Sequence, residues 1–160
     1  VSWNDCQKFI TRLNEYNNEH KIAPYGYKFC LPTEAQWEYA ARAESESAYP
    51  GTDDINDVGW YSENSGGKIH PVRQKKTNDW GLYDTVGNVW EWCQDGPRDY
   101  TNEAVTDPTG PETGRSDRVL RGGGWNNYAE YCLSAYRVAY DPAFPWLGLC
   151  GFRLVLVRQE

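Results

Sequence analysis

One segment, from Arg118 to Val157, constrains the fold of this chain more than any other, because strand-like ends enclose an aromatic stretch. Residues 118–121 alternate apolar and charged side chains, which predicts a strand with one buried face. Residues 152–157 form an apolar run that predicts a central strand. The sequence from 131 to 151 contains no Lys, Gln or Glu, although a solvated loop normally contains some of them.

The aromatic residues inside this segment allow two interpretations. An aromatic-rich surface without lysine is typical of a protein contact site. Aromatic runs are also common in cores, so a buried meander of short strands is the alternative. The residues concerned are Trp125, Tyr128, Tyr131, Tyr136, Tyr140, Phe144 and Trp146.

Length and charge limit the remaining interpretations. A chain of 160 residues can form one domain with a real core, and we predict a single domain over 1–160. The sequence has no Met and begins inside a predicted helix, so we expect earlier residues of the domain to precede it. The net charge of −7 disfavours nucleic acid and anionic membrane surfaces as partners. No apolar run is long enough for a membrane span.

The cysteines do not indicate a zinc site. Their number is odd and none of them forms a CxxC pair. Buried free thiols are one interpretation. A bridge between Cys93 and Cys132, or between Cys132 and Cys150, is another that the sequence leaves open.

Local signals predict two helices. Ser2 as N-cap, with Asp5 three residues later, begins a helix over Val1–Glu19 that carries one apolar stripe. Thr33 as N-cap, with Gln36 three residues later, forms a capping box that begins a second helix of about three turns.

Two acidic stretches invite functional interpretations that we do not prefer. Glu34 and Glu38 lie one helical turn apart, as paired catalytic carboxylates can. Glu38 also precedes Arg42 by four residues, which is the spacing of a helical ion pair, and we prefer that interpretation. Residues 44–67 are acidic and turn-rich but lack EF-hand spacing, so we predict a surface loop there.

A metal site is one interpretation of the stretch from Gly81 to Trp92. Asp84 and Glu91 flank a Gly-Asn turn, and their carboxylates would form a partial calcium cage with the carbonyls of Gly87 and Val89. The alternative is an Asn-containing hairpin turn that leads into a Trp-rich strand.

Six motifs, in order along nearly the whole chain, resemble the formylglycine-generating enzyme (sulfatase-modifying factor) domain family. The resemblance implies an α+β protein with a C-type-lectin-like fold, in which two or more helices pack on small antiparallel sheets beside much irregular structure. The motifs are VSW at 1–3, LPTEAQWEYAAR at 31–42, GLYD at 81–84, GNVWEW at 87–92, RGG at 121–123 and GFRL at 151–154.

The same resemblance bears on catalysis and metals. Catalytic members use two cysteines after the Gly-Gly turn, which bind copper and activate oxygen. Alignment on that turn places the second cysteine on Cys132 and the first on Asn127. No copper is therefore expected, and an oxidase that relies on Cys132 stays as the alternative. The calcium cage described above matches the family's second calcium site, so the resemblance implies a structural calcium.

The chain is also similar to variable proteins that retroelements diversify, a group that includes the treponeme variable protein. In that group a C-terminal segment is rewritten at adenines, typically in asparagine codons. Such changes yield Tyr, Phe, Leu, Ala, Pro, Val and Cys, among others, but not Lys, Gln, Glu or Met. Most residues of the corresponding segment here belong to the reachable set, whereas Glu130 and Trp146 do not.

The leading prediction is a ligand-binding display protein at the cell surface or outside the cytoplasm. Its segment from about 122 to 155 would present a variable aromatic surface to a protein or surface ligand that the sequence does not identify. A non-catalytic accessory domain is a further alternative. The predicted ligand-binding residues are Asn127, Tyr128, Tyr131, Leu133, Tyr140, Phe144, Trp146 and Leu147.

Overall fold

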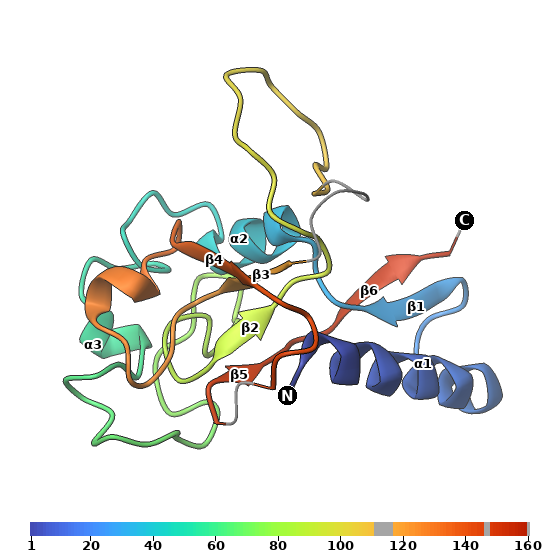
Figure 1. Ribbon diagram of the computed structural model, residues 1–160, viewed down its shortest axis with the longest axis horizontal. Coiled ribbons are helices and arrows are strands. Elements are labelled where there is room, and N and C mark those ends of the chain that lie inside the picture. The colour runs from blue at the N-terminus through green and yellow to red at the C-terminus, as the bar shows by residue number, and fades with distance from the viewer. Residues whose placement is uncertain (111–116, 146–147, 160) are drawn as a thin grey trace.

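The computed structural model of the chain describes residues 1–110, 117–145 and 148–159 (Figure 1). The described part is an α+β structure with short helices, small sheets and long irregular connections. Its elements are α1 (Trp3–His20), β1 (Tyr27–Cys30), α2 (Glu34–Arg42), α3 (Ile55–Val58), β2 (Trp90–Trp92), β3 (Arg118–Arg121), the 3-10 helix η1 (Ala129–Cys132), β4 (Arg137–Tyr140), β5 (Cys150–Gly151) and β6 (Val155–Arg158).

The two predicted helices are confirmed, and both begin at the predicted caps. The Ser2 hydroxyl accepts from the backbone N–H of Asp5 at 3.1 Å, and the Asp5 carboxylate accepts from the N–H of Ser2. At α2, the Thr33 hydroxyl accepts from the N–H of Gln36 at 3.2 Å, and the Gln36 side chain accepts from the N–H of Thr33. Each box satisfies backbone donors that the helix leaves free.

A four-stranded sheet with the order β4-β3-β2-β5 lies at the centre of the molecule. β3 pairs antiparallel with both β4 and β2, but β2 and β5 pair parallel, with Trp90 opposite Cys150. The expectation of purely antiparallel sheets is therefore wrong for this pair. A parallel neighbour needs a long crossover, and nearly 60 residues separate these two strands.

The predicted strand over 118–121 is confirmed as β3, but the prediction of one buried face is wrong. Val119, Leu120 and Arg121 are all buried, because both sides of the strand are covered. Val119 packs with Trp37 of α2, and side chains alternate along a strand, so Leu120 points to the opposite side.

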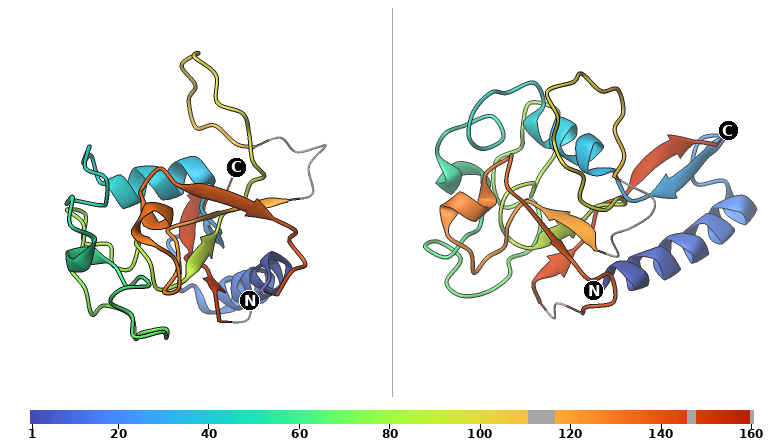
Figure 2. Two further views of the ribbon diagram at one scale, coloured as in Figure 1. Left: turned by 60° about the vertical axis from the view of Figure 1, so that its left-hand side comes forward. Right: turned by 45° about the horizontal axis from the view of Figure 1, so that its top comes forward.

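The prediction of a central strand over 152–157 is also wrong. β6 begins three residues later and pairs only with β1, in a separate two-stranded sheet where Leu156 is 41% exposed. Residues 152–154 lie outside the strand because Arg153 turns toward Glu91. α1 runs alongside this small sheet, and its Asn14 bonds both backbone groups of Phe29 at 2.8 Å (Figure 2).

The surface loop predicted over 44–67 is only partly a surface segment. It contains α3, and its residues Tyr49, Ile55, Val58 and Tyr61 form a core cluster with Val86 and Cys132. The Tyr49 hydroxyl donates to the carbonyl of Ala129 at 3.2 Å. The sequence did not predict this packing, because its apolar residues are scattered among acidic ones without a helical or strand period.

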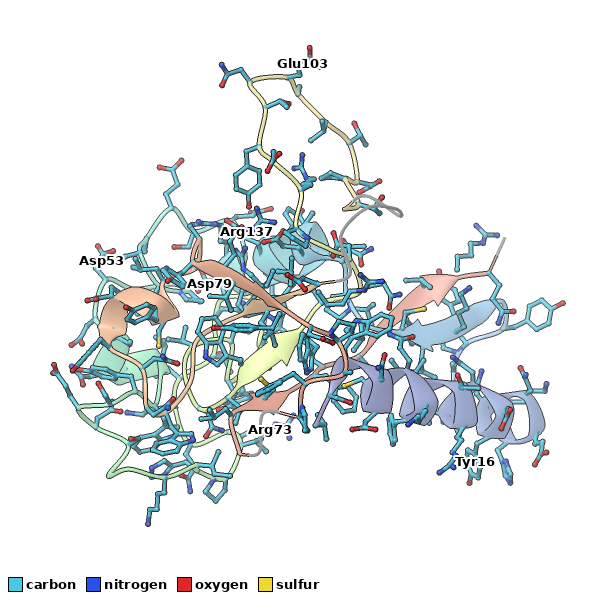
Figure 3. All side chains as sticks on the ribbon, in the orientation of Figure 1. Tyr16, Asp53, Arg73, Asp79, Glu103 and Arg137 are labelled. Atoms are coloured by element: carbon cyan, nitrogen blue, oxygen red, sulfur yellow. The ribbon has the colours of Figure 1, made fainter. Side chains whose placement is uncertain are left out.

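The described residues 93–110, which follow β2, include a loop that projects from the molecule, with Glu103 near its tip (Figure 3). Its base is narrow: the N–H of Gly110 donates to the Asp95 carboxylate at 2.9 Å. A Cβ atom on Gly110 would lie 1.9 Å from the carbonyl oxygen of Gly96, so no larger residue fits there. Within the described part of the chain, no helix has both the length and the apolarity that a bilayer crossing requires.

Candidate ligand-binding site

A hollow of about 200 Å³ opens on the side of the four-stranded sheet that faces away from α2. We name it the aromatic hollow. Leu120, Val138 and Tyr140 reach it from β3 and β4, since they alternate with the residues that contact α2. Its full lining is Trp90, Leu120, Asn126, Asn127, Tyr131, Tyr136, Val138, Tyr140, Leu149 and Cys150.

The aromatic rings of the hollow support one another. The rings of Tyr131 and Tyr136 meet edge to face with centroids 5.1 Å apart. The centroids of Trp90 and Tyr136 are 6.2 Å apart, at a tilt of 50°. Such contacts stabilise aromatic pairs beyond their buried area, so the walls are held in place before any ligand arrives.

Asn127 connects the hollow to the Gly-Gly turn. Its side-chain oxygen accepts from Trp90 Nε1 at 2.9 Å and from the N–H of Gly124 at 3.0 Å. The preceding Gly123 has φ +75°, and a Cβ atom there would lie 2.5 Å from the Cys132 sulfur. Asn127 therefore orients Trp90 and also holds the turn, in addition to lining the hollow.

The predicted ligand-binding residues do not all gather at the hollow. Asn127, Tyr131 and Tyr140 line it. Tyr128 and Phe144 are exposed, at 64% and 52%, but lie outside its lining. The half-buried Leu133 packs against the core cluster around Tyr49, away from the hollow's floor. Trp146 and Leu147 lie outside the described residues.

The sequence analysis did not assign Trp90, Asn126, Tyr136, Val138 and Leu149 to the site. Tyr136 belongs to the aromatic run, so composition could have indicated it. Trp90 lies on β2, far from the aromatic run in the sequence, and the motif that contains it was interpreted as a metal site.

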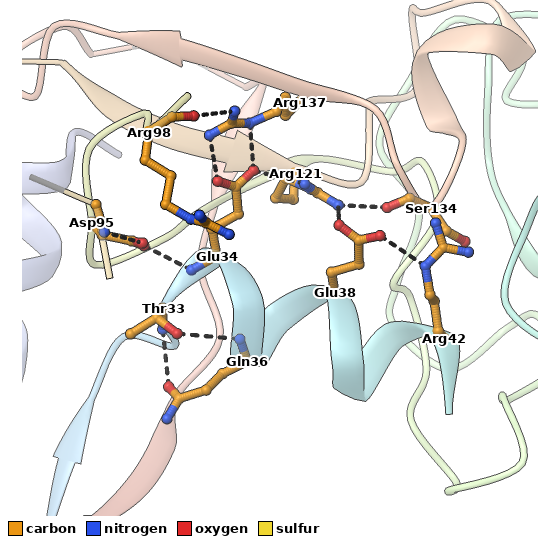
Figure 4. Close-up of polar contacts among 11 residues, drawn as sticks. Thr33, Glu34, Gln36, Glu38, Arg42, Asp95, Arg98, Arg121, Ser134 and Arg137 are labelled. Atoms are coloured by element: carbon orange, nitrogen blue, oxygen red, sulfur yellow. Dashed lines mark hydrogen bonds and ion pairs between the residues drawn. The ribbon is translucent and has the colours of Figure 1, made fainter. Parts of the chain in front are cut away.

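The α2 side of the sheet carries a network of charges (Figure 4). Arg121, with a side chain 0% exposed, bonds Glu34 at 2.7 Å and Glu38 at 2.6 Å. Arg137 forms two bonds to the Glu34 carboxylate, at 2.7 and 2.5 Å. The predicted pair of Glu38 and Arg42 is confirmed at 2.8 Å. The two glutamates are therefore ion-pair partners of strand arginines, a role that helix spacing alone could not show.

Charge pairing sets the ionisation of Glu38. Burial alone would raise the pKa of its carboxyl, but Arg121 and Arg42 together hold that pKa below its ordinary value. Glu38 therefore stays ionised at neutral pH and keeps the network charged.

The four residues predicted to hold calcium do not form an open oxygen cage. Both Glu91 oxygens bond Arg153, at 2.5 and 2.7 Å, and one also accepts from Trp37 Nε1 at 2.6 Å. The Asp84 carboxylate accepts from the N–H of Arg73 at 2.8 Å. A cation beside Glu91 would face the Arg153 guanidinium, so this arrangement does not fit calcium. Calcium binding at Asp84, Gly87, Val89 and Glu91 therefore remains an untested prediction, which this arrangement of ion pairs does not favour.

The cysteines are separate free thiols, so neither bridge considered from the sequence is formed. Burial raises the pKa of the Cys132 thiol to about 12 and that of the Cys150 thiol to about 12. Cys132 lies in the cluster around Tyr49, whereas Cys150 lies in the cluster around Cys6. The fold therefore does not bring Cys150 beside Cys132.

Comparison with known proteins identifies the family. The profile of the Sulfatase-modifying factor enzyme 1-like domain matches residues 1–158. The chain belongs to this family. A formylglycine-generating enzyme of Streptomyces coelicolor is 40% identical over 156 residues, which cover 87% of this chain and 45% of that protein. This family member spans about half the length of the curated relatives it matches.

Two solved structures of similar fold extend the comparison. Treponema denticola variable protein 1 superposes with a TM-score of 0.75 and 43% identity, over 82% of this chain and 48% of the other. PvdO from Pseudomonas aeruginosa superposes with a TM-score of 0.82 and 26% identity, over 100% of this chain and 60% of the other. These similarities support the predicted α+β fold of the formylglycine-generating enzyme type.

The residues of this family member do not fit a copper site built from two thiolates. Asn127 stands where the first cysteine is expected, and its oxygen is engaged by Trp90 and Gly124. Cys132 supplies one sulfur and is fully buried. Among the described residues, no three His, Cys, Asp or Glu side chains are grouped to hold a metal. We therefore assign no chemical step to Cys132.

Proposed function

We propose that this domain is a ligand-binding display protein, whose segment from about 122 to 155 forms the binding surface. The observation that carries the proposal is the gathering of Asn127, Tyr131 and Tyr140 around one hollow. Three of the residues expected to contact ligand thus share a concave surface with the framework residue Trp90. A concave, aromatic-lined surface with few polar groups is the usual form of a binding site.

Exposed aromatic residues elsewhere in the segment also support this proposal. Tyr128 and Phe144 present large rings to solvent, and Tyr140 is 40% exposed. Tyrosine offers a large contact area with few rotatable bonds, which is why binding surfaces favour it. The similarity to Treponema denticola variable protein 1 supports the same class of function.

Diversification by a retroelement and location at the cell surface are parts of the same proposal. They rest on the residue types of the segment, not on its geometry. Sequencing of the surrounding genome tests them. We expect a near-identical copy of the coding segment for 122–155 close to a reverse transcriptase, with differences only where adenines stand in the copy.

Two libraries of equal size test whether the segment is the binding surface. The first randomises four aromatic positions of the segment, and the second randomises four exposed aromatic positions elsewhere. We expect only the first to yield binders to a panel of unrelated proteins. Equal yields from both would contradict the proposal. The positions are Tyr128, Tyr131, Tyr140 and Phe144 in the first library, and Tyr16, Tyr25, Tyr39 and Trp80 in the second.

An oxidase is the second candidate, because relatives of 32–40% identity are named formylglycine-generating enzymes. The test incubates the protein with copper, oxygen and a sulfatase peptide that contains cysteine. We expect the wild-type chain to leave the peptide unchanged, and Asn127→Cys serves as the variant with both cysteine positions filled. Oxidation by the wild type would contradict the display proposal.

A further inference from the structure

We propose that the aromatic hollow receives an organic cation, namely an ammonium or guanidinium group that a protein ligand presents on one side chain. The inference rests on the proposed binding function and specifies the chemistry of its ligand. Three features carry it: the rings that line the hollow, the charges around it and its size.

Four electron-rich rings line the hollow, and they come from separate parts of the chain. Trp90 belongs to β2, Tyr131 to η1 and Tyr140 to β4, while Tyr136 precedes β4. A cation over the face of such rings is attracted by their quadrupoles, and tryptophan gives the strongest attraction. The rings are not parallel, since Trp90 and Tyr136 meet at 50° and Tyr131 and Tyr136 at 76°.

The same chain uses this interaction repeatedly elsewhere. Lys75 lies 4.0 Å from the centroid of the Trp60 ring, and Arg121 lies 5.3 Å from that of Trp37. Among the described residues, none of these cation–π contacts uses the ring of Trp90, Tyr131 or Tyr136. Tyr136 instead contacts the rings of both Trp90 and Tyr131.

The lining of the hollow carries no positive charge that would repel a cationic ligand. No ionisable acid or base lines it apart from tyrosine and cysteine groups. From 122 to 150 the charged residues are Glu130, Arg137 and Asp141, and the two acids are exposed. Arg137 is committed to Glu34 on the opposite side of the sheet. Arg118 lies with its guanidinium 4.8 Å from the centroid of the Trp3 ring.

A net charge of −7 adds to this local pattern. Oppositely charged surfaces steer association and exclude partners of the wrong sign. A carboxylate or phosphate in the hollow would find no cation in its lining, so an acidic side chain is a less favourable occupant than a cation.

The size of the hollow limits the size of the ligand group that can enter it. At about 200 Å³ it is smaller than the roughly 300–1,000 Å³ of small-molecule sites. It has room for the head group of one side chain but not for a typical small-molecule ligand. The rest of the ligand would then rest on the exposed rings of Tyr128 and Phe144.

A pair of matched probes tests this inference. Choline carries a trimethylammonium group, and 3,3-dimethylbutan-1-ol has the same shape without the charge. Titration of each into the intact protein is followed by NMR at the indole N–H of Trp90. We expect choline to bind about 5- to 30-fold more tightly than the neutral alcohol, as cation–π attraction in a partly desolvated site predicts.

Three variants locate the effect. Tyr140→Phe keeps the ring and should keep the preference for choline, whereas Tyr140→Leu removes the ring and should weaken choline binding several-fold. Tyr25→Leu removes an exposed ring outside the hollow and outside the proposed binding segment, and should change neither probe's binding. Equal affinities for the two probes, or no shift of Trp90 with either, would overturn the inference.

The outcomes also separate this inference from the display proposal. If the first library yields binders while choline fails, the binding surface stands and the cationic ligand is excluded. If choline binds in the hollow while both libraries yield binders equally, the hollow stands and the display function is excluded.

Discussion

The two sides of the four-stranded sheet differ in chemistry although the same strands build both. Toward α2, Arg121 forms ion pairs with Glu34 and Glu38, and Arg137 forms one with Glu34. Toward the hollow, the lining is mostly aromatic and aliphatic, with two asparagines and a cysteine, and carries no ion pair among the described residues. One side therefore holds the strands by directed, charge-assisted bonds, and the other offers contact area to a partner.

If the hollow binds a ligand as proposed, this difference separates stability from recognition. Strand alternation sends Val119 and Arg121 to one side and Leu120 to the other. A substitution that faces the hollow leaves the ion pairs behind it intact. We therefore expect substitutions on the α2 side to lower the free energy of unfolding most, and substitutions of exposed residues outside the hollow to lower it least.

The largest effect is expected for Arg121→Met. It leaves two glutamates next to an uncharged side chain in a buried site, which typically costs about 3–5 kcal/mol. Urea unfolding measures the loss. Lys76→Met is the control, since its side chain is 71% exposed and its pair with Asp57 should contribute at most about 1 kcal/mol. Similar losses for the two variants would remove the distinction between the faces.

A smaller effect is expected for Asn127→Ala. The variant leaves the Trp90 indole N–H and the Gly124 N–H without their acceptor, which costs about 1–3 kcal/mol. Asn126→Ala is the control, because Asn126 is exposed and also lines the hollow. Thermal unfolding compares the two. An equal stability for both would show that Asn127 is as replaceable as its neighbour.

The pH dependence of stability should reflect Glu38. Its pKa in the folded protein is lowered from 4.5, so its contribution is present above that value and lost as the pH falls. Between about pH 5 and pH 3, the melting temperature of the wild type should fall more steeply than that of Glu38→Gln, which has no proton to gain. Parallel curves for the two proteins would contradict the assignment.

The smallest effects are expected at the exposed rings. Tyr128→Ser and Phe144→Ser should each change the free energy of unfolding by no more than about 0.5 kcal/mol, since both side chains are more than half exposed. Both should nevertheless reduce the affinity of any ligand selected against the segment. A loss of stability above about 2 kcal/mol would place these rings in the framework instead.

Sequence reasoning predicted the elements whose signals are local. The capping boxes at Ser2 and Thr33 lie within four residues and gave both helix starts. β5 could not be found in this way, because its two residues become a strand only through pairing with β2. The same limit explains why the strand predicted over 152–157 was wrong at its start, where Arg153 bonds the distant residue Glu91.

The candidate site was predictable in part for the same reason. The aromatic run indicated a contact segment that includes Tyr131 and Tyr140, and the resemblance to variable proteins added Asn127. It could not show that Trp90 completes the hollow or that Arg121 is buried. Both facts depend on partners more than 35 positions away in the sequence, Asn127 for Trp90 and Glu34 for Arg121.

The contact between Gly123 and the Cys132 sulfur has a consequence for the evolution of this gene. A side chain at 123 would collide with that sulfur at 2.5 Å. Folding therefore requires glycine at 123, whatever residues stand around it. Atomic crowding alone fixes this position, independently of any partner that the surface binds.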